Sequence, residues 1–103
     1  MTATLLINAS VLDVERGALI PDQAVLIDGE RIIEVGPVHV VRSTDPRTLD
    51  LRGKTLLPGL IDCHVHVTAA TADLSELAEW SPTYVAAHAQ SILRGMLERG
   101  FTT

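Results

Sequence analysis

The sequence has few aromatic residues and almost no cysteine. Only Trp80, Tyr84 and Phe101 are aromatic, so a core has to be built from Val, Ile, Leu and Ala. The single Cys63 has no second cysteine with which to form an internal disulfide. Disulfides mark oxidising compartments, and nothing in this sequence indicates one.

The sequence also lacks a basic run and a long apolar run. Its formal net charge is −5, which argues against binding to nucleic acid and to anionic membrane surfaces, since both attract basic patches. No apolar stretch approaches the roughly 18 residues that span a bilayer. The N-terminal residues have no basic segment before their apolar ones, so they do not read as a signal peptide. These absences predict a soluble, cytoplasmic protein.

The first 57 residues have the pattern of a small β domain. The composition, 47% hydrophobic and 20% charged, is that of a folded protein. Two apolar runs, 24–27 and 31–35, flank Asp28-Gly29, a pair that favours a tight hairpin turn. Gly36-Pro37 ends the second run. The pattern predicts an antiparallel, sandwich-like unit of about five or six strands.

From residue 58 the pattern changes to that of an α/β unit. Residues 60–67 form a mostly apolar run typical of a strand covered on both faces. Asp73 and Glu76 are spaced to cap a short helix. Ser81-Pro82 is a helix start and Arg99-Gly100 a helix stop, and 101–103 resemble the beginning of another strand. A strand, a helix and an unfinished strand predict a truncated βαβ unit.

The tripeptide His64-Val65-His66 carries the clearest chemical signal. Side chains two apart on a strand point to the same face, so both imidazoles are expected to point the same way. Two such nitrogens can bind one metal ion at about 2.0–2.1 Å each. A His-x-His tripeptide standing alone is a weak signal, and more often belongs to two histidines that bind nothing.

The surrounding residues favour the metal interpretation. The histidines follow Pro58-Gly59-Leu60 at the end of an apolar strand, where barrel enzymes place catalytic groups. The string PGLIDCHVH, after a β unit, resembles the opening of the amidohydrolase superfamily. Leu60 and the final GFTT resemble the branch that contains imidazolonepropionases and metal-dependent Xaa-Pro or Xaa-Arg dipeptidases.

The resemblance implies an α/β fold with two parts. Residues 1–57 would form a small β domain, part of a composite sandwich, and 58–103 the first strand and helix of a TIM (β/α)₈ barrel. Since such a barrel needs about 250 residues, the chain is expected to be an N-terminal fragment.

The resemblance also implies the activity. His64 and His66 would bind the more buried of one or two divalent ions, most often zinc, which activates water to hydrolyse an amide, cyclic amide or dipeptide bond. The further ligands and the general base would follow Thr103. The 103 residues would then contain no catalytic residue and be inactive alone.

Other residues have candidate roles beside plainer ones. Asp62 is expected on the same face as the histidines, where it either orients a ligand by a hydrogen bond or pairs within the barrel floor. Trp80, after the first strand, either lines the substrate pocket or packs in a solvated cap. Cys63 is expected to be buried on the opposite face, His39 to lie in a strand, and His88 to serve packing.

Two other readings of the chain stay open. It is a β-rich binding module with incidental histidines, or a truncated homologue that associates with other chains. The enzyme reading predicts a small-molecule or dipeptide substrate and no nucleic-acid or membrane partner. The binding-module interpretation predicts a monomer that unfolds cooperatively, whereas we expect self-association through exposed sheet edges.

Overall fold

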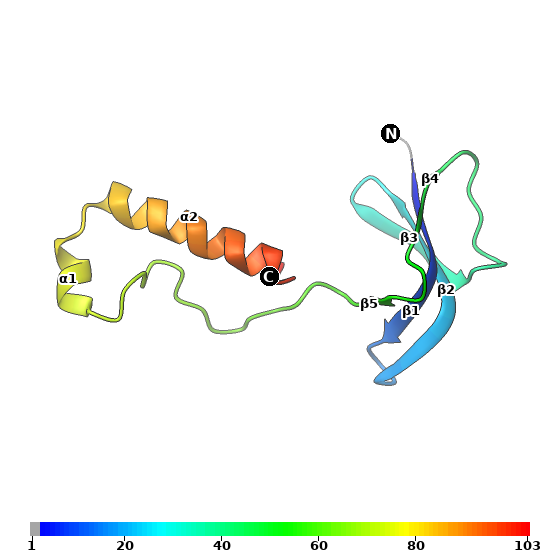
Figure 1. Cartoon of the computed structure of the whole chain (residues 1–103), viewed down its shortest axis with the longest axis horizontal. Coiled ribbons are helices and arrows are strands. Elements are labelled where there is room, and N and C mark those ends of the chain that lie inside the picture. Colours follow the sequence, from blue (N-terminus) through cyan, green and yellow to red (C-terminus); the bar gives the residue numbers. More distant parts are fainter. Residues whose placement is uncertain (1–2) are drawn as a thin grey trace. The chain divides into compact units, whose positions relative to one another are not determined.

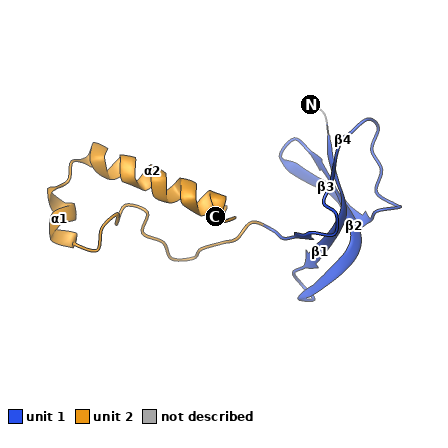
Figure 2. Ribbon diagram, in the orientation of Figure 1, with its two compact units in different colours: residues 1–58 blue, residues 59–103 orange. Residues whose placement is uncertain are grey.

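The computed structural model describes residues 3–103, which divide into two compact units, 1–58 and 59–103 (Figure 2). The first unit holds every named strand: β1 (Thr4–Asp13), β2 (Ala18–Asp28), β3 (Arg31–Pro37), β4 (Arg47–Asp50) and β5 (Thr55–Leu56). The second holds both helices, α1 (Leu74–Glu79) and α2 (Pro82–Glu98) (Figure 1). Among the described residues, neither helix is long and apolar enough to cross a membrane.

The five strands form one mixed sheet in the order β3-β2-β1-β4, with β5 also paired to β1. The β1–β2 and β2–β3 pairs are antiparallel, as predicted, but β4 and β5 run parallel to β1. The prediction of an antiparallel unit was therefore wrong for two of the three strands that pair with β1. The residues described in the first unit build no second sheet, so the composite sandwich stays a prediction.

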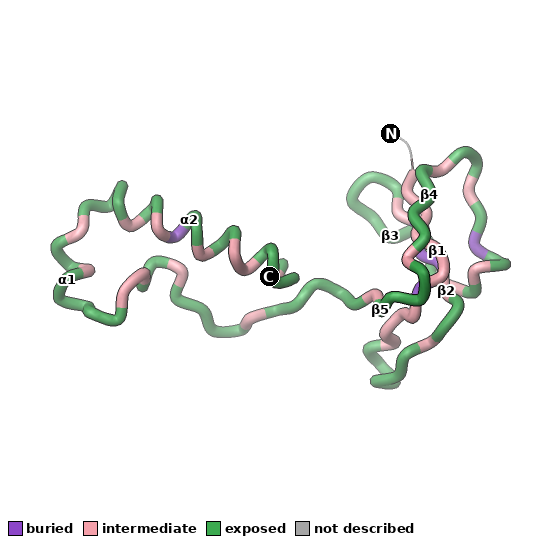
Figure 3. Tube along the Cα trace, in the orientation of Figure 1, coloured by how far each residue is buried: buried purple, intermediate pink, exposed green. Residues whose placement is uncertain are grey.

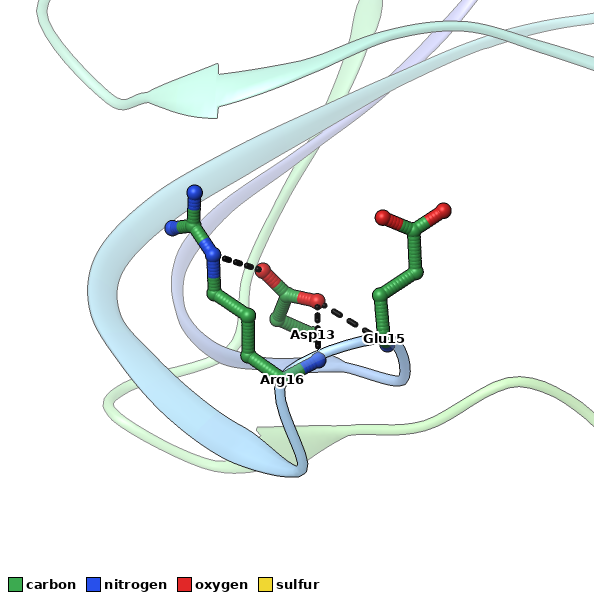
Figure 4. Close-up of polar contacts among 3 residues, drawn as sticks. All are labelled: Asp13, Glu15 and Arg16. Atoms are coloured by element: carbon green, nitrogen blue, oxygen red, sulfur yellow. Dashed lines mark hydrogen bonds and ion pairs between the residues drawn. The ribbon is translucent and has the colours of Figure 1, made fainter.

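The two hairpins are fixed by local turn chemistry. Between β1 and β2, one Asp13 carboxylate oxygen accepts from the main-chain N–H groups of Glu15 (3.0 Å) and Arg16 (3.1 Å), while the Arg16 side chain lies 3.6 Å from the other oxygen (Figure 4). Between β2 and β3, Asp28 pairs with Arg31, so the loop is Gly29-Glu30. Only Gly29 has a positive φ there, of 57°. The predicted hairpin is confirmed, with its turn one residue later than expected.

A left-handed residue in the middle of β1 lets that strand change partner. Asn8 has φ 56°, and the register of β1 against β2 shifts on both sides of Ala9. Before this point β1 pairs with β4, and after it with β5. The Asn8 side-chain amide donates to the Asp50 carboxylate at 3.0 Å, and the Asn8 main-chain carbonyl accepts from the Gly53 N–H at 2.7 Å. These bonds hold the turn that joins β4 to β5.

The core of the first unit is small and lies under the middle of β2. Ala24 and Val41 are fully buried, and Leu26 is nearly so (Figure 3). Residues that pack around them come from β1 and from the loop after β3; they are Ala3, Leu5, Ile7 and Val38. His39, expected in a strand, lies in the exposed turn that follows β3. The chain turns there because the Val40 and Val41 N–H groups both donate to the Pro37 carbonyl.

Both helices of the second unit begin where the sequence predicts, and α2 also ends where it predicts. The Asp73 carboxylate caps α1 by accepting from Ser75 and Glu76, and the Ser81 hydroxyl caps α2 by accepting from Tyr84. Gly100, with φ 91°, ends α2. The Gly100 N–H donates to Leu97 and the Phe101 N–H to Met96, which is the Schellman pattern.

The segment after Gly59 pairs in parallel with the segment after α2. Leu60 and Phe101 form the bridge. The Leu60 N–H donates to Gly100 (2.8 Å), Thr102 to Leu60 (2.9 Å) and Asp62 to Thr103 (2.9 Å). The predicted strand-helix-strand connection is therefore present in short form. The strand expected over 60–67 was too long, because the chain bends at Cys63 and His64, just past the last of these bonds.

Candidate metal centre

The imidazoles of His64 and His66 meet edge to edge. Their Nε2 atoms lie 2.8 Å apart, and their ring centroids are 4.9 Å apart at 57°. Since a hydrogen bond joins two nitrogens only when one carries the proton, one Nε2 donates and the other accepts. Both residues are exposed. The expectation that the two rings point the same way is met, although the segment is a bend rather than a strand.

The spacing of the two nitrogens suits a shared metal ion. Two nitrogens bound at about 2.0–2.1 Å to one tetrahedral zinc ion lie about 3.3 Å apart, so an ion would require a separation only about half an ångström greater than the observed one. Neutral imidazole is also a preferred ligand of zinc and other transition ions. Within residues 3–103, however, no three His, Cys, Asp or Glu side chains gather closely enough to hold an ion. The pair fits as part of a metal site.

Asp62 contacts the main chain of the pair and not its rings. One carboxylate oxygen accepts from the His64 main-chain N–H at 3.1 Å, and the Asp62 side chain is half-buried. Across the part of the chain that the structure describes, neither Nδ1 atom of the two histidines has a hydrogen-bond partner. Asp62 is thus close to the pair, as expected. It bonds to the main-chain N–H of His64 and not to either imidazole ring.

Cys63 is exposed, and the expectation that it is buried was wrong. Ile61 and Val65, two residues before and two after Cys63, were expected on the same face as Cys63. They are also exposed, at 66% and 46%. In residues 59–103, Ala89 on α2 is the sole buried apolar residue (Figure 3). Nothing in this unit covers the Cys63 side of the segment, which explains the difference.

Trp80 belongs to a cluster of three rings at the start of α2. Its ring centroid lies 4.7 Å from that of Tyr84 and 4.9 Å from that of His88, and those two are 4.6 Å apart. Tyr84 and His88 are one helical turn apart, so they share a face of α2. This spacing, visible in the sequence, could have predicted the cluster. It explains His88 as a packing residue.

An apolar hollow of about 400 Å³ lies between α2, residues 65–67 of the histidine segment and residues 101–103 after the helix. Its lining consists of apolar side chains and two threonines: Val65, Val67, Leu93, Met96, Leu97, Phe101, Thr102 and Thr103. Leu93 and Leu97 are 47% and 64% exposed. The helix therefore presents more apolar surface than this unit covers.

Comparison with known proteins identifies the family. No protein-family model matches the chain. An imidazolonepropionase of Cereibacter sphaeroides strain KD131 is 48% identical over 59 residues, which cover 56% of this chain and 15% of that enzyme. A solved prolidase, in complex with N-methylphosphonate-L-proline, is 46% identical and superposes with a TM-score of 0.91 over 99% of this chain and 25% of its own. A solved amidohydrolase is 38% identical, with a TM-score of 0.89 over 98% of this chain and 24% of its own.

The chain belongs to the amidohydrolase superfamily. The resemblance read from PGLIDCHVH is thereby confirmed. This amidohydrolase chain spans about a quarter of the solved enzymes and less of the imidazolonepropionase. These named relatives, the prolidase and the imidazolonepropionase, are hydrolases of carbon–nitrogen bonds that act on small molecules.

Proposed function

We propose that these 103 residues are the N-terminal part of a metal-dependent amidohydrolase that hydrolyses an amide, cyclic amide or dipeptide bond. The observation that carries the proposal is the 2.8 Å approach of the His64 and His66 Nε2 atoms just after a parallel β-bridge. In open and closed parallel sheets, ligands and catalytic groups gather at the carboxyl ends of the strands. The histidine pair follows the carboxyl end of the segment that begins at Leu60.

Residues 58–103 are proposed to be the first strand and helix of a (β/α)₈ barrel, and 1–57 a separate β domain. The parallel Leu60–Phe101 bridge with α2 between its two sides supports this, because parallel neighbours need such a crossover. The exposed apolar side chains of Leu93 and Leu97 support it as well. A barrel helix packs on its strands and on neighbouring helices, so a lone one leaves such residues uncovered.

His64 and His66 are proposed to hold one divalent ion, most often zinc in this superfamily, through Nε2. The ion, when bound, would polarise the scissile carbonyl and lower the pKa of its bound water to about 7. The two residues contribute fixed neutral nitrogens at a spacing close to that required. Both Nε2 atoms would have to be free of a proton in order to bind the ion.

Trp80 is proposed to form part of the substrate pocket. It precedes α2 by two residues, on the connection that follows the histidine segment, and its ring is braced by Tyr84 and His88. In a barrel, this connection lies on the face that carries the active site. A braced, half-exposed indole offers a rigid apolar surface to a small substrate.

A catalytic zinc site normally uses three protein ligands and water, and the described residues supply two close ones. The further ligands, a possible second ion, and the general base are proposed to come from residues outside this chain. The 103 residues are therefore expected to bind metal weakly and to hydrolyse nothing. We place the complete enzyme in the cytoplasm.

The test is an activity assay on the longer gene product beside the 103-residue chain. A panel of Xaa-Pro dipeptides and cyclic amides is offered with zinc and with a chelator. We expect metal-dependent hydrolysis by the long product, background rates for the short chain, and background rates for the His64→Ala, His66→Ala double variant. The matched control, His39→Ala, removes an exposed histidine of the turn after β3 and should stay active. Hydrolysis that survives loss of His64 and His66 would overturn the proposal.

A further inference from the structure

We propose that Asp62 is the positioning residue of the histidine pair and that it acts through the main chain. Its carboxylate accepts the His64 N–H at 3.1 Å and thereby holds the bend that brings the two imidazoles together. The inference deepens the proposed function, because it says how the pair is held ready for an ion. It requires no charge on Asp62, only an acceptor oxygen.

Asp62 is itself held in place by the ladder. Its own N–H donates to the Thr103 carbonyl at 2.9 Å, which is the last bond of the parallel ladder that begins at Leu60. The residue is half-buried, whereas Cys63, His64, Val65 and His66 are all exposed. Asp62 is thus the point where the paired segment ends and an unpaired one begins.

The segment that follows Asp62 is unpaired and bent. Past Asp62 no main-chain ladder continues within the described residues, and the chain bends at Cys63 and His64. A short carboxylate that accepts a main-chain N–H two residues later forms an Asx turn, which replaces the missing ladder bond. The turn is thus a local restraint on the main chain of the first of the two histidines.

Among the described residues, the His64 and His66 rings have no hydrogen-bond partner other than each other. Metal-binding histidines commonly donate their second ring nitrogen to a carboxylate or carbonyl, which fixes the ring. Among residues 3–103, neither His64 nor His66 has such a partner at Nδ1, and Asp62 contacts the main chain instead. The His64 ring is consequently placed by its main chain, and the His66 ring by the 2.8 Å contact with it.

The test compares Asp62→Asn with Asp62→Ala in the tag-free 103-residue chain. Asparagine keeps an acceptor oxygen at the same place and loses the charge; alanine loses both. Asp73→Ala is the matched control, because Asp73 also accepts main-chain N–H groups, of Ser75 and Glu76, but at the start of α1. Two readouts are measured by NMR: hydrogen exchange of the His64 amide, and the ring signals of His64 and His66 during zinc titration.

We expect the His64 amide of Asp62→Ala to exchange roughly two- to tenfold faster, the equivalent of one lost hydrogen bond. Asp62→Asn and Asp73→Ala should match the wild type. Zinc should shift both histidine signals together in wild type and Asp62→Asn, and at higher zinc concentration in Asp62→Ala. If Asp62→Asn behaves like Asp62→Ala in both readouts, the carboxylate acts through its charge and the inference is overturned. If no variant responds to zinc, the proposed function fails while the exchange rates still decide the role of Asp62.

Discussion

Gly59 lies directly beneath the side chain of Thr102, although most of the second unit separates them in sequence. A Cβ on Gly59 would come within 2.6 Å of the Thr102 Cγ2 atom and 2.8 Å of its Cβ, closer than side chains pack. The absence of a side chain at Gly59 therefore permits the pairing of Leu60 with Phe101 in the next position along. The His64–His66 pair follows this ladder directly along the chain.

Gly59→Ala should weaken the ladder. Because the added methyl overlaps Thr102, we expect overpacking to cost about 1–3 kcal/mol in local stability. Hydrogen exchange of the Asp62 and Thr102 amides, both ladder donors, measures the change. Gly36→Ala is the control, since its Cβ would meet the Val41 side chain at an ordinary 3.5 Å. Unchanged protection in Gly59→Ala would show that the pairing does not depend on this close approach.

Cys63 should react quickly with thiol reagents in the native 103-residue chain, because it is exposed beside exposed Ile61 and Val65. In the longer protein we expect much slower labelling, since a barrel would cover that side of the strand with helices. Mass spectrometry after iodoacetamide treatment measures both rates, with each protein in denaturant as its own reference. Equal native rates in the two proteins would contradict the barrel proposal.

Asp50 should contribute acid-sensitive stability to the first unit. The hydrogen bond from the Arg52 main-chain N–H, and then the one from the Asn8 side chain, lower the pKa of Asp50 below its usual 3.8. A lowered folded pKa means that this stabilisation is present above about pH 3.8 and is lost as the pH falls through the lower folded value. Carbon NMR of the Asp50 carboxyl follows the titration directly.

Asn8→Ala supplies the comparison for that titration. It removes the second of the two donors, so the pKa of Asp50 should rise toward its usual value while the Arg52 bond remains. An Asp50 titration curve identical in the two proteins would mean that the Asn8 contact does not form in solution.

The chain should associate with itself through β3. This edge strand is unpaired on its outer side and exposes apolar residues, among them Ile32 and Val35. Open edges of this kind invite pairing with a second strand, and charges on an edge suppress it. Size-exclusion chromatography with light scattering should show oligomers for the wild type and fewer for Ile32→Lys. A monomer that unfolds cooperatively would instead favour the reading as a self-contained β module.

The sequence predicted what local chemistry decides. The caps at Asp73 and Ser81, the stop at Gly100 and the hairpin after Asp28 each depend on neighbouring residues, and each forms. The sequence also predicted that the His64 and His66 rings lie together. The prediction assumed a strand, whereas the segment is bent. The family followed from one string of residues.

The remainder depends on contacts distant in sequence. The parallel pairing of β4 and β5 with β1 is set by where the loop after β3 leads, and by the left-handed Asn8 at which β1 changes partner. The bend at Cys63 lies just past Asp62, the last residue bonded to the ladder partner, and Cys63 is exposed because nothing in this unit covers it. The pattern of apolar residues predicts that a segment is a strand, but it does not predict which other strand pairs with it.

Zinc titration of the tag-free chain, followed through the imidazole signals of all four histidines, tests the central claim most directly. The account predicts that His64 and His66 respond together at one shared affinity, that His39 and His88 respond weakly or not at all, and that His64→Ala abolishes the response of His66. A response of equal strength at all four histidines, or a His66 signal that still moves normally in His64→Ala, would contradict it.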